Sequence, residues 1–192
     1  MIILAALLLL TAGAAVPDCR SDRAAIMDLP QDRFDQDMAG GWRELSTRGC
    51  EREAADLIRD WRNRHRTDSR ILTWHEGQLR ANIGQTGQAV ALFRQSYDPP
   101  LEDPGLGWNL YVDGSIAFLN ADRAALQTAR DRLAVLPRPA GFAPVGADGK
   151  PAAVRWPPNV QVLDGLLRCW GRPYRVAYTC PVPSDGPRAT QP

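Results

Sequence analysis

Residues 70–98, RILTWHEGQLRANIGQTGQAVALFRQSYD, determine the predicted fold class of this chain. Apolar residues recur at helical spacing from 72 to 83 and again from 89 to 97. The segment 84–87, Gly-Gln-Thr-Gly, separates the two runs, and Pro99 and Pro100 follow the second run. Glycine is common just past a helix end, and proline cannot continue a helix. The stretch therefore predicts two helices joined by a short turn.

The same plan recurs on both sides of this stretch with a period near 35 residues, which Ala54, Ala89 and Ala124 mark. The apolar faces on either side contain Phe34, Met38, Trp42 and Leu45, then Leu57, Ile58 and Trp61, and downstream Trp108, Tyr111, Val112, Ile116 and Phe118, then Ala125, Leu126, Ala129, Leu133 and Leu136. The sequence therefore predicts an all-α fold with about three helical hairpins across residues 31–137.

Gly77, followed by Ala89 and then Phe93, resembles the tetratricopeptide repeat, whose pattern is W-x2-L-G-x2-Y, then A-x3-F, then P. The resemblance covers about residues 31–137. In that family, stacked hairpins form a superhelix, and the first helix of each hairpin lines an inner groove. The alternative is an ordinary helical bundle in which the spacing arises by chance.

Matching the three alanines to the repeat alanine of that family implies which side chains line the groove. The implied residues are Arg43, Ser46, Trp74, Gln78, Asn82, Asn109 and Asp113. The polar members are not needed for a core, so replacing Asn109 or Asp113 by alanine is expected to change stability little. Chaperone-binding members of the family need a lysine at the place of Trp74, so the resemblance does not favour a peptide C-terminus as the ligand.

Residues 1–15 have the layout of a removable signal peptide, an apolar run followed by small residues. The run is shorter than the roughly 20 residues of a membrane-spanning helix, and Pro17 and Asp18 follow it at once. We therefore expect cleavage near Ala14 or Ala15, a periplasmic or secreted protein, and no permanent membrane anchor. The first residues contain no Lys or Arg, so a start further upstream stays open.

The four cysteines all lie in the part expected to be exported, and an even count favours disulfides in an oxidising compartment. Three pairings are possible. We favour pairing of neighbours, Cys19 with Cys50 and Cys169 with Cys180, because each bridge would fix a chain end that otherwise frays. Metal or redox chemistry is the alternative, but there is no C-x-x-C and no histidine at a zinc-ligand spacing. We therefore expect no metal and no cofactor.

The composition changes after the third hairpin. Residues 138–158 are a connection rich in Pro and Gly, for which a small β-hairpin near 141–156 and a plain loop are equally consistent. A helix within 159–180 would cap the open end of the repeat stack. Residues 181–192 are expected to be a disordered tail, and residues 16–30 an N-terminal segment ahead of the repeats.

No catalytic constellation stands out. His75 and Glu76 begin the zinc-protease motif H-E-x-x-H, but Leu79 stands where the second histidine is required. The net charge of +1 and the pI of about 7.7 give no global field that would attract nucleic acid. The basic residues between 59 and 70 could hold phosphate or an acidic partner, although stabilisation of a helix end is the simpler interpretation.

These observations predict an exported, non-enzymatic module that binds or scaffolds a protein or peptide partner. The alternative is an enzyme, or an enzyme accessory, that acts on envelope material. Its site would lie where the repeats meet residues 138–180. A buried histidine or carboxylate beside a serine or cysteine would favour that alternative, and the sequence alone shows none.

Overall fold

The computed structural model describes residues 17–99, 105–146 and 149–182, and within these ranges all regular structure is helical. The predicted all-α class is therefore confirmed. The signal peptide predicted for residues 1–15 lies outside the described residues, as does nearly all of the predicted tail. None of the helices in the described ranges is long and apolar enough to cross a membrane.

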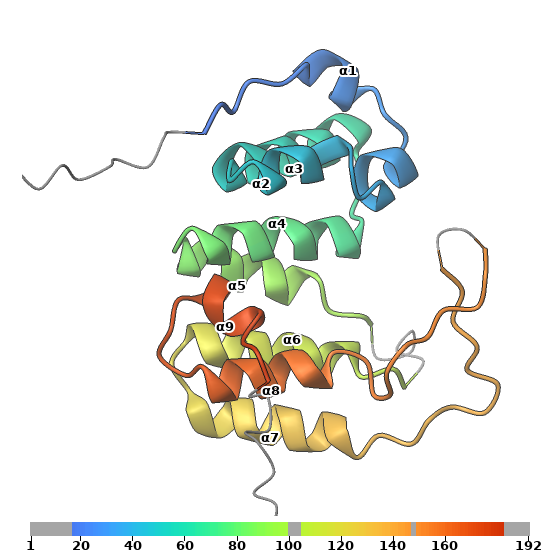
Figure 1. Ribbon diagram of the computed structural model, residues 1–192, viewed down its shortest axis with the longest axis vertical. Helices are drawn as coiled ribbons and strands as arrows, with labels where there is room; N and C mark the ends of the chain where they lie inside the picture. Colours follow the sequence, from blue (N-terminus) through green and yellow to red (C-terminus); the bar gives the residue numbers. More distant parts are fainter. Residues whose placement is uncertain (1–16, 100–104, 147–148, 183–192) are drawn as a thin grey trace, which may run out of the picture.

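The helices follow one another along the molecule in chain order, as Figure 1 shows, and the last two turn back onto the earlier ones. Their bounds are α1 (Arg23–Met27), a short π-helical segment η1 (Asp32–Gln36), α2 (Gly41–Thr47), α3 (Glu51–His65), α4 (Arg70–Asn82), α5 (Thr86–Gln95), α6 (Trp108–Leu119), α7 (Arg123–Ala134), α8 (Val160–Arg168) and α9 (Tyr174–Tyr178).

Neighbouring helices pair across short turns, α2 with α3, α4 with α5 and α6 with α7. Gly84 ends α4 with a φ of +77°, a left-handed conformation that glycine adopts without steric cost. At the start of α7 the Asp122 side chain accepts a hydrogen bond from the Ala125 N–H at 2.9 Å, which satisfies one free donor of the first turn. The expectation that these pairs form a tetratricopeptide superhelix stays a prediction.

The first pair departs from the prediction. The apolar face expected from Phe34 through Met38 to Leu45 is not one helix, because the chain breaks between η1 and α2 and Met38 is 75% exposed. Gly41 enforces the break. Its φ is +55°, and a Cβ there would lie 2.0 Å from the Phe34 carbonyl oxygen, so only glycine fits. Phe34 is nevertheless buried, stacked on Trp61 at 4.7 Å.

A second cluster of buried side chains surrounds Trp74. Its indole stacks on Phe93 at 4.1 Å and lies against Trp108 and Tyr111 of α6. Gly77 allows the close approach of α4 and α5, because a Cβ there would lie 2.7 Å from the Phe93 ring. The Gly77–Phe93 contact therefore gives a physical reason for the spacing noted in the sequence.

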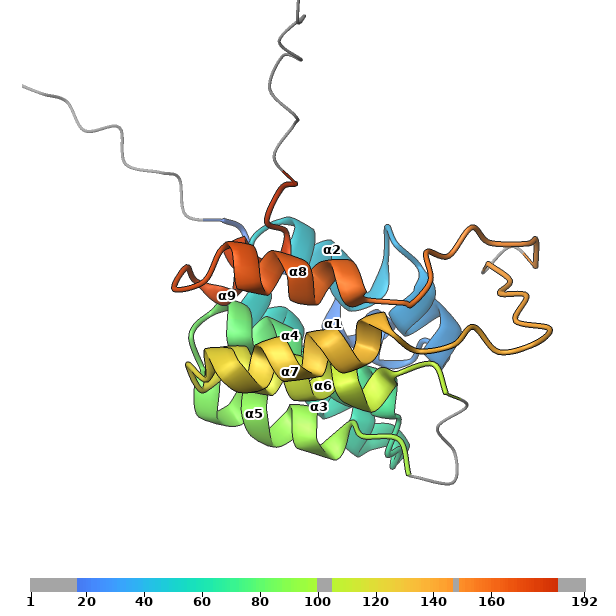
Figure 2. The same cartoon turned by 90° about the horizontal axis from the view of Figure 1, so that it is seen from below.

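The C-terminal part folds back along the earlier helices. Figure 2 shows α8 and α9 on the same side of the molecule as α2 and opposite α3 and α5. Helix α8 packs on α6 and α7, and α9 reaches α4. The capping helix predicted within 159–180 is two helices instead, because Gly171, with a φ of +79°, and Pro173 lie between α8 and α9.

The connection between α7 and α8 contains no helix or strand in its described residues. The hairpin considered for 141–156 is reduced to one isolated antiparallel bridge between Val145 and Pro151. Trp156 anchors the connection, since its indole N–H donates to the Leu136 carbonyl at 2.9 Å and its ring packs edge-on against Phe142.

Both predicted disulfides are present, and no cysteine is free. The bridge between Cys19 and Cys50 ties the N-terminal segment to the start of α3. The bridge between Cys169 and Cys180 joins the end of α8 to the residues after α9 and so closes the C-terminal pair of helices.

Candidate binding cavities

A small cavity opens between α2, α4 and α9, and we call it the α2–α4 cavity. Its volume is about 330 Å³, close to the lower end of the roughly 300–1,000 Å³ typical of ligand sites. The lining residues are Trp42, Arg43 and Ser46 from α2, His75, Gln78, Leu79 and Asn82 from α4, and Tyr174 and Tyr178 from α9.

One wall of this cavity is built on the buried carboxylate of Asp35, at the end of η1. Oδ1 of Asp35 accepts a hydrogen bond from the Trp42 indole N–H at 2.9 Å and lies 2.7 Å from Nδ1 of His75. An ionised carboxylate only accepts hydrogen bonds, so the proton of this contact sits on Nδ1 of His75. Asp35 therefore fixes the orientation of both rings.

Arg43 completes the wall. Its Nε donates to the Asp35 backbone carbonyl at 2.7 Å, and its guanidinium lies 3.6 Å from Oδ1 of Asp35 and 4.3 Å from the Trp42 ring centroid. Burial by itself would raise the pKa of Asp35, but the contacts with His75, Trp42 and Arg43 outweigh it and hold this pKa below its usual value. Asp35 therefore opposes the charge of Arg43 directly.

The opposite wall comes from the C-terminal helix α9. Tyr178 pairs its hydroxyl with that of Tyr111 at 2.9 Å. Tyr174 is 4% exposed, and its buried hydroxyl oxygen has no hydrogen-bond partner. Burial raises the pKa of Tyr174 and the neighbouring Tyr178 adds to the rise, whereas the side chains of Ser115 and Gln78 oppose it.

Several other polar groups of the lining also lack a partner among the described residues. They are Nε2 of His75, the hydroxyl of Ser46 and the side-chain amide of Gln78. Asn82 uses its amide N–H to bond Glu51 at 2.9 Å, which leaves its side-chain oxygen available. The cavity therefore presents several hydrogen-bonding groups that the fold does not use.

Four of the seven residues predicted for a groove meet in this cavity: Arg43, Ser46, Gln78 and Asn82. Trp74 does not, since it is 2% exposed and packed between Phe93 and the aromatic residues of α6. The expectation that Trp74 lines a groove is therefore wrong, because α5 and α6 both cover its ring.

Asn109 and Asp113 also lie outside this cavity. Asn109 clamps the backbone of Asp98, accepting from its N–H at 2.8 Å and donating to its carbonyl at 2.9 Å. Asp113 is exposed and accepts a hydrogen bond from the Tyr97 hydroxyl at 2.5 Å. Asn109 therefore has a structural task that the sequence did not reveal.

Nothing in the sequence indicates that Asp35, His75, Tyr174 and Tyr178 belong to one site. His75 stood out only as a fragment of a zinc-protease motif, and Asp35 carried no signal. The arrangement places a buried carboxylate behind a histidine, with Ser46 in the same lining. Ser46 makes no hydrogen bond to His75 within the described ranges.

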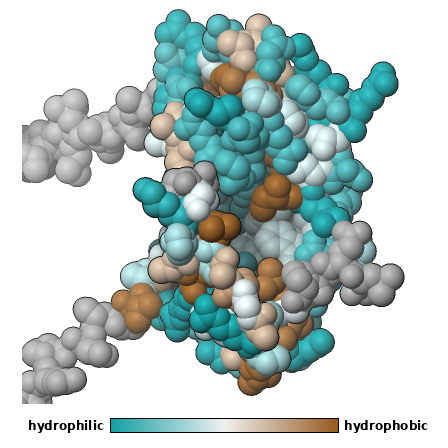
Figure 3. All heavy atoms as spheres, turned by 90° about the vertical axis from the view of Figure 1, so that its right-hand side faces the viewer, coloured by the Kyte–Doolittle hydropathy of each residue, from teal (hydrophilic) through white to brown (hydrophobic). Residues whose placement is uncertain are grey.

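A larger cavity lies at the other end of α4, and we call it the α4–α6 cavity. Its volume is about 760 Å³. Its lining includes Ile71, Tyr97, Pro99, Leu106, Trp108 and Pro158, together with the polar residues Asp68, Ser69, Arg70, Gln95, Asp98 and Asn159. The face of the molecule in Figure 3 is hollowed near its centre, and hydrophobic residues lie beside the hollow.

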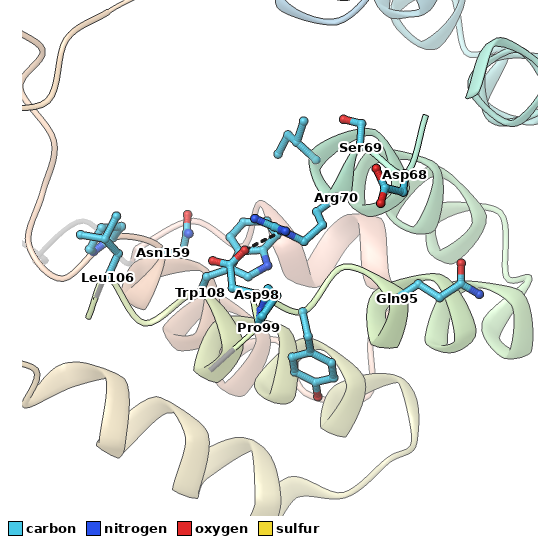
Figure 4. Close-up of a pocket in the computed structure, with 12 residues that line it drawn as sticks. Asp68, Ser69, Arg70, Gln95, Asp98, Pro99, Leu106, Trp108 and Asn159 are labelled. Carbon is cyan, nitrogen blue, oxygen red and sulfur yellow. Dashed lines mark ion pairs between the residues drawn. The ribbon is translucent and has the colours of Figure 1, made fainter. Parts of the chain in front are cut away.

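Figure 4 shows Arg70 and Asp98 pointing toward each other across this cavity, beside Trp108. Nε of Arg70 lies 2.9 Å from Oδ1 of Asp98. The Trp108 indole N–H donates to the Ser96 carbonyl at 2.7 Å, which fixes the ring while it stays partly exposed. Asp68 forms no ion pair with any described residue, so it leaves an excess negative charge on the rim.

The basic residues between 59 and 70 are mostly engaged within the fold. Arg59 pairs with Asp56 and Asp60, Arg62 with Glu76, Arg64 with Asp28 and Arg70 with Asp98. His65 contacts the Met27 carbonyl at 2.9 Å. These pairs neutralise the cluster and weaken the interpretation that it binds phosphate.

One group of potential metal ligands occurs in the described residues, formed by Cys19, Cys50 and Glu53 within 4.8 Å of one another. The two sulfur atoms are joined in a disulfide, whereas a metal requires a thiolate. This group therefore offers no metal site while the bridge is intact.

Comparison with known proteins identifies no relative of this chain. No protein-family model, no curated protein and no solved structure matches this chain. Its function is therefore inferred from the geometry of the two cavities.

Proposed function

We propose that this chain is an exported, non-enzymatic module that binds a protein partner by receiving a large apolar side chain in the α4–α6 cavity. The observation that carries this proposal is the partly exposed Trp108, held rigidly by its bond to Ser96 beside an open volume of about 760 Å³. A rigid aromatic ring beside a preformed pocket is typical of the anchor points that dominate protein interfaces.

The charges of the rim indicate the kind of segment that fits. Arg70 is already paired with Asp98, whereas the Asp68 carboxylate forms no ion pair with any residue that the structure describes. A basic side chain next to the apolar anchor would form an ion pair with Asp68 at the rim. Binding of the partner would partly exclude water there and so strengthen this ion pair. We therefore expect a partner segment with an aromatic or large aliphatic residue beside a lysine or arginine.

Export is supported by the two disulfides, which persist in oxidising compartments and are rare in the cytosol. The mature protein is expected to begin near Ala15 or Val16 and to contain no free thiol. Intact-mass and thiol-labelling measurements on exported material check both points. Retention of residues 1–14, or alkylation of all four cysteines without reductant, would contradict export by signal cleavage.

Selection of phage-displayed peptides on the oxidised chain tests partner binding. Enriched peptides are expected to share an apolar anchor beside a basic residue and to shift the Trp108 indole N–H resonance. Ile71→Glu is expected to weaken their binding at least tenfold, because it places a charge among the apolar groups of the cavity. Val135→Glu, at a side chain that is 79% exposed and outside the cavity, is the matched control.

Asp68→Asn provides a second variant that does not disturb packing, because Asp68 is exposed. It is expected to weaken only the peptides with a basic residue, whereas Asp32→Asn, the same change at an exposed position outside the cavity, is expected to have no effect. If no peptide is enriched, or if Ile71→Glu and Val135→Glu bind the enriched peptides equally, the proposal fails.

A further inference from the structure

The α2–α4 cavity carries a second inference, which is independent of partner binding at the α4–α6 cavity. Its lining combines unpaired hydrogen-bonding groups with the rings of Trp42, Tyr174 and Tyr178, and the C-terminal helix α9 closes one side. What it can bind follows from the chemistry of these groups.

The charges within the cavity disfavour an ionic ligand. No lining residue is acidic, so a cation would find no counter-charge in the lining. Arg43 is the one arginine of the lining, and the buried Asp35 carboxylate already opposes it at 3.6 Å. An anion would have to compete with Asp35 for the guanidinium and would be repelled by the same carboxylate.

The unpaired groups disfavour an apolar ligand as well. A purely apolar occupant would bury Ser46, Gln78 and Nε2 of His75 without partners, and each such group is costly to bury unpaired. The Tyr174 hydroxyl is already buried without a hydrogen-bond partner. A ligand that enters the cavity must therefore supply hydrogen-bonding groups.

The unpaired groups include both donors and acceptors. The hydroxyl of Ser46 and the amide of Gln78 each offer a donor and an acceptor, and Asn82 has a side-chain oxygen to spare. Because Nδ1 of His75 holds its proton toward Asp35, Nε2 of a neutral ring is an acceptor. Ligand hydroxyl groups, which also donate and accept, are the natural complement.

We propose that the α2–α4 cavity binds one ring of a neutral, polyhydroxylated ligand of the monosaccharide class. Gln78 and Ser46 bond the ligand hydroxyls, while the aromatic rings of the lining contact its carbon face. The volume of about 330 Å³ restricts the site to a small ring. Such a ring is either a free sugar or the terminal unit of a glycan.

Nuclear magnetic resonance titration of the oxidised full chain tests the proposal with glucose, galactose, mannose and N-acetylglucosamine. At least one of these is expected to shift the Trp42 indole and the Gln78 amide resonances in a saturable way. Glucuronate tests the disfavoured anion, and cyclohexanol tests a ring of similar size that keeps only one hydroxyl. Both are expected to bind at least tenfold more weakly than the sugar. A disaccharide of the bound sugar binds as well if the ligand is a glycan end, and fails to bind if it is a free sugar.

Two variants assign the binding to this cavity. Gln78→Ala is expected to lower the affinity about tenfold, whereas Gln88→Ala, the same truncation at an exposed position of α5, leaves it unchanged. Ser46→Ala is expected to lower the affinity without lowering the unfolding temperature, because its hydroxyl has no hydrogen bond to a described residue to lose. The proposal is overturned if no neutral sugar produces saturable shifts, if cyclohexanol or glucuronate binds as well as the sugar, or if Gln78→Ala and Gln88→Ala behave alike.

Discussion

Nδ1 of His75 lies 2.7 Å from Oδ1 of Asp35, although the two residues are separated by forty positions in the chain. The contact joins η1 to α4 and, through the Trp42 indole, to α2. Three elements of the N-terminal half thus converge on one carboxylate that is fully buried. The contribution of this carboxylate to the free energy of unfolding can be measured, and so can the dependence of that contribution on pH.

Replacing Asp35 by asparagine is expected to lower the free energy of unfolding by about 3 kcal/mol, because it removes the charge that His75 and Arg43 face and leaves a buried donor without an acceptor. Urea unfolding followed by circular dichroism measures the change. Asp32→Asn, an exposed position in the same segment, is the control and is expected to change stability by less than about 0.5 kcal/mol. Equal effects of the two variants would show that the carboxylate is not a structural centre.

The contribution of Asp35 is expected to depend on pH. Its pKa is lower in the folded state than its ordinary value of 3.8, so the unfolded chain binds more protons as the pH falls. The stabilisation is therefore complete above pH 3.8 and is lost as the pH falls through the lowered folded value. Burial raises the pKa of Glu76 despite Arg62 and Arg80, which acts in the opposite direction.

The difference in unfolding free energy between the wild-type chain and Asp35→Asn removes the Glu76 contribution, because both proteins share it. This difference is expected to shrink as the pH is lowered below 3.8. A difference that stays constant from pH 6 to pH 2 would mean that Asp35 keeps its ordinary titration in the folded state.

Replacing a glycine by alanine is expected to have opposite effects on the free energy of unfolding at two positions in adjacent helices. Gly77→Ala should lower the free energy of unfolding by about 1–3 kcal/mol, because its Cβ would lie 2.7 Å from the buried ring of Phe93. Gly87→Ala, where nothing lies within 4 Å of the new Cβ, should raise it by up to about 1 kcal/mol. Thermal unfolding of both variants checks the pair, and a stabilising Gly77→Ala would refute the close approach of α4 and α5.

Asn109→Ala is expected to lower the free energy of unfolding by about 1–3 kcal/mol, because both hydrogen bonds to the Asp98 backbone are lost. Asp113→Ala should cost less than about 1 kcal/mol, since it removes one bond from an exposed side chain. Denaturant unfolding of the two variants separates these values. Equal and small losses would restore the original expectation that both residues are dispensable for the fold.

Removing the C-terminal bridge by Cys169→Ala with Cys180→Ala is expected to lower stability by about 3 kcal/mol, from the entropy of a loop with a sequence separation of 11. The bridge between Cys19 and Cys50, with a separation of 31, should contribute about 3–4 kcal/mol. Thermal unfolding of the variant and of the wild-type chain, each with and without reductant, separates the contributions of the two bridges. The variant should lose less stability on reduction than the wild-type chain, and an equal loss would show that the C-terminal bridge does not stabilise the fold.

The sequence by itself determined the local features of this protein. Helical spacing together with Gly84 located α4 and α5, and the recurrence of that plan located the later helices. The cysteine count, together with the general tendency of chain ends to fray, led to the correct disulfide pairing. These features depend on residues close in the chain, or on a general cost of free ends, and both are visible in a sequence.

Only the tertiary structure decided which side chains are buried and which face a cavity. Trp74 and Gln78 lie one turn apart on α4, yet α5 and α6 cover the first while the second remains in an open cavity. Asp35 meets His75 although they lie forty positions apart in the chain, and glycine at position 41 permits the break between η1 and α2. A helical period shows that a helix has two faces, but burial depends on distant elements, such as α9 against α4, whose position follows from packing of the whole chain.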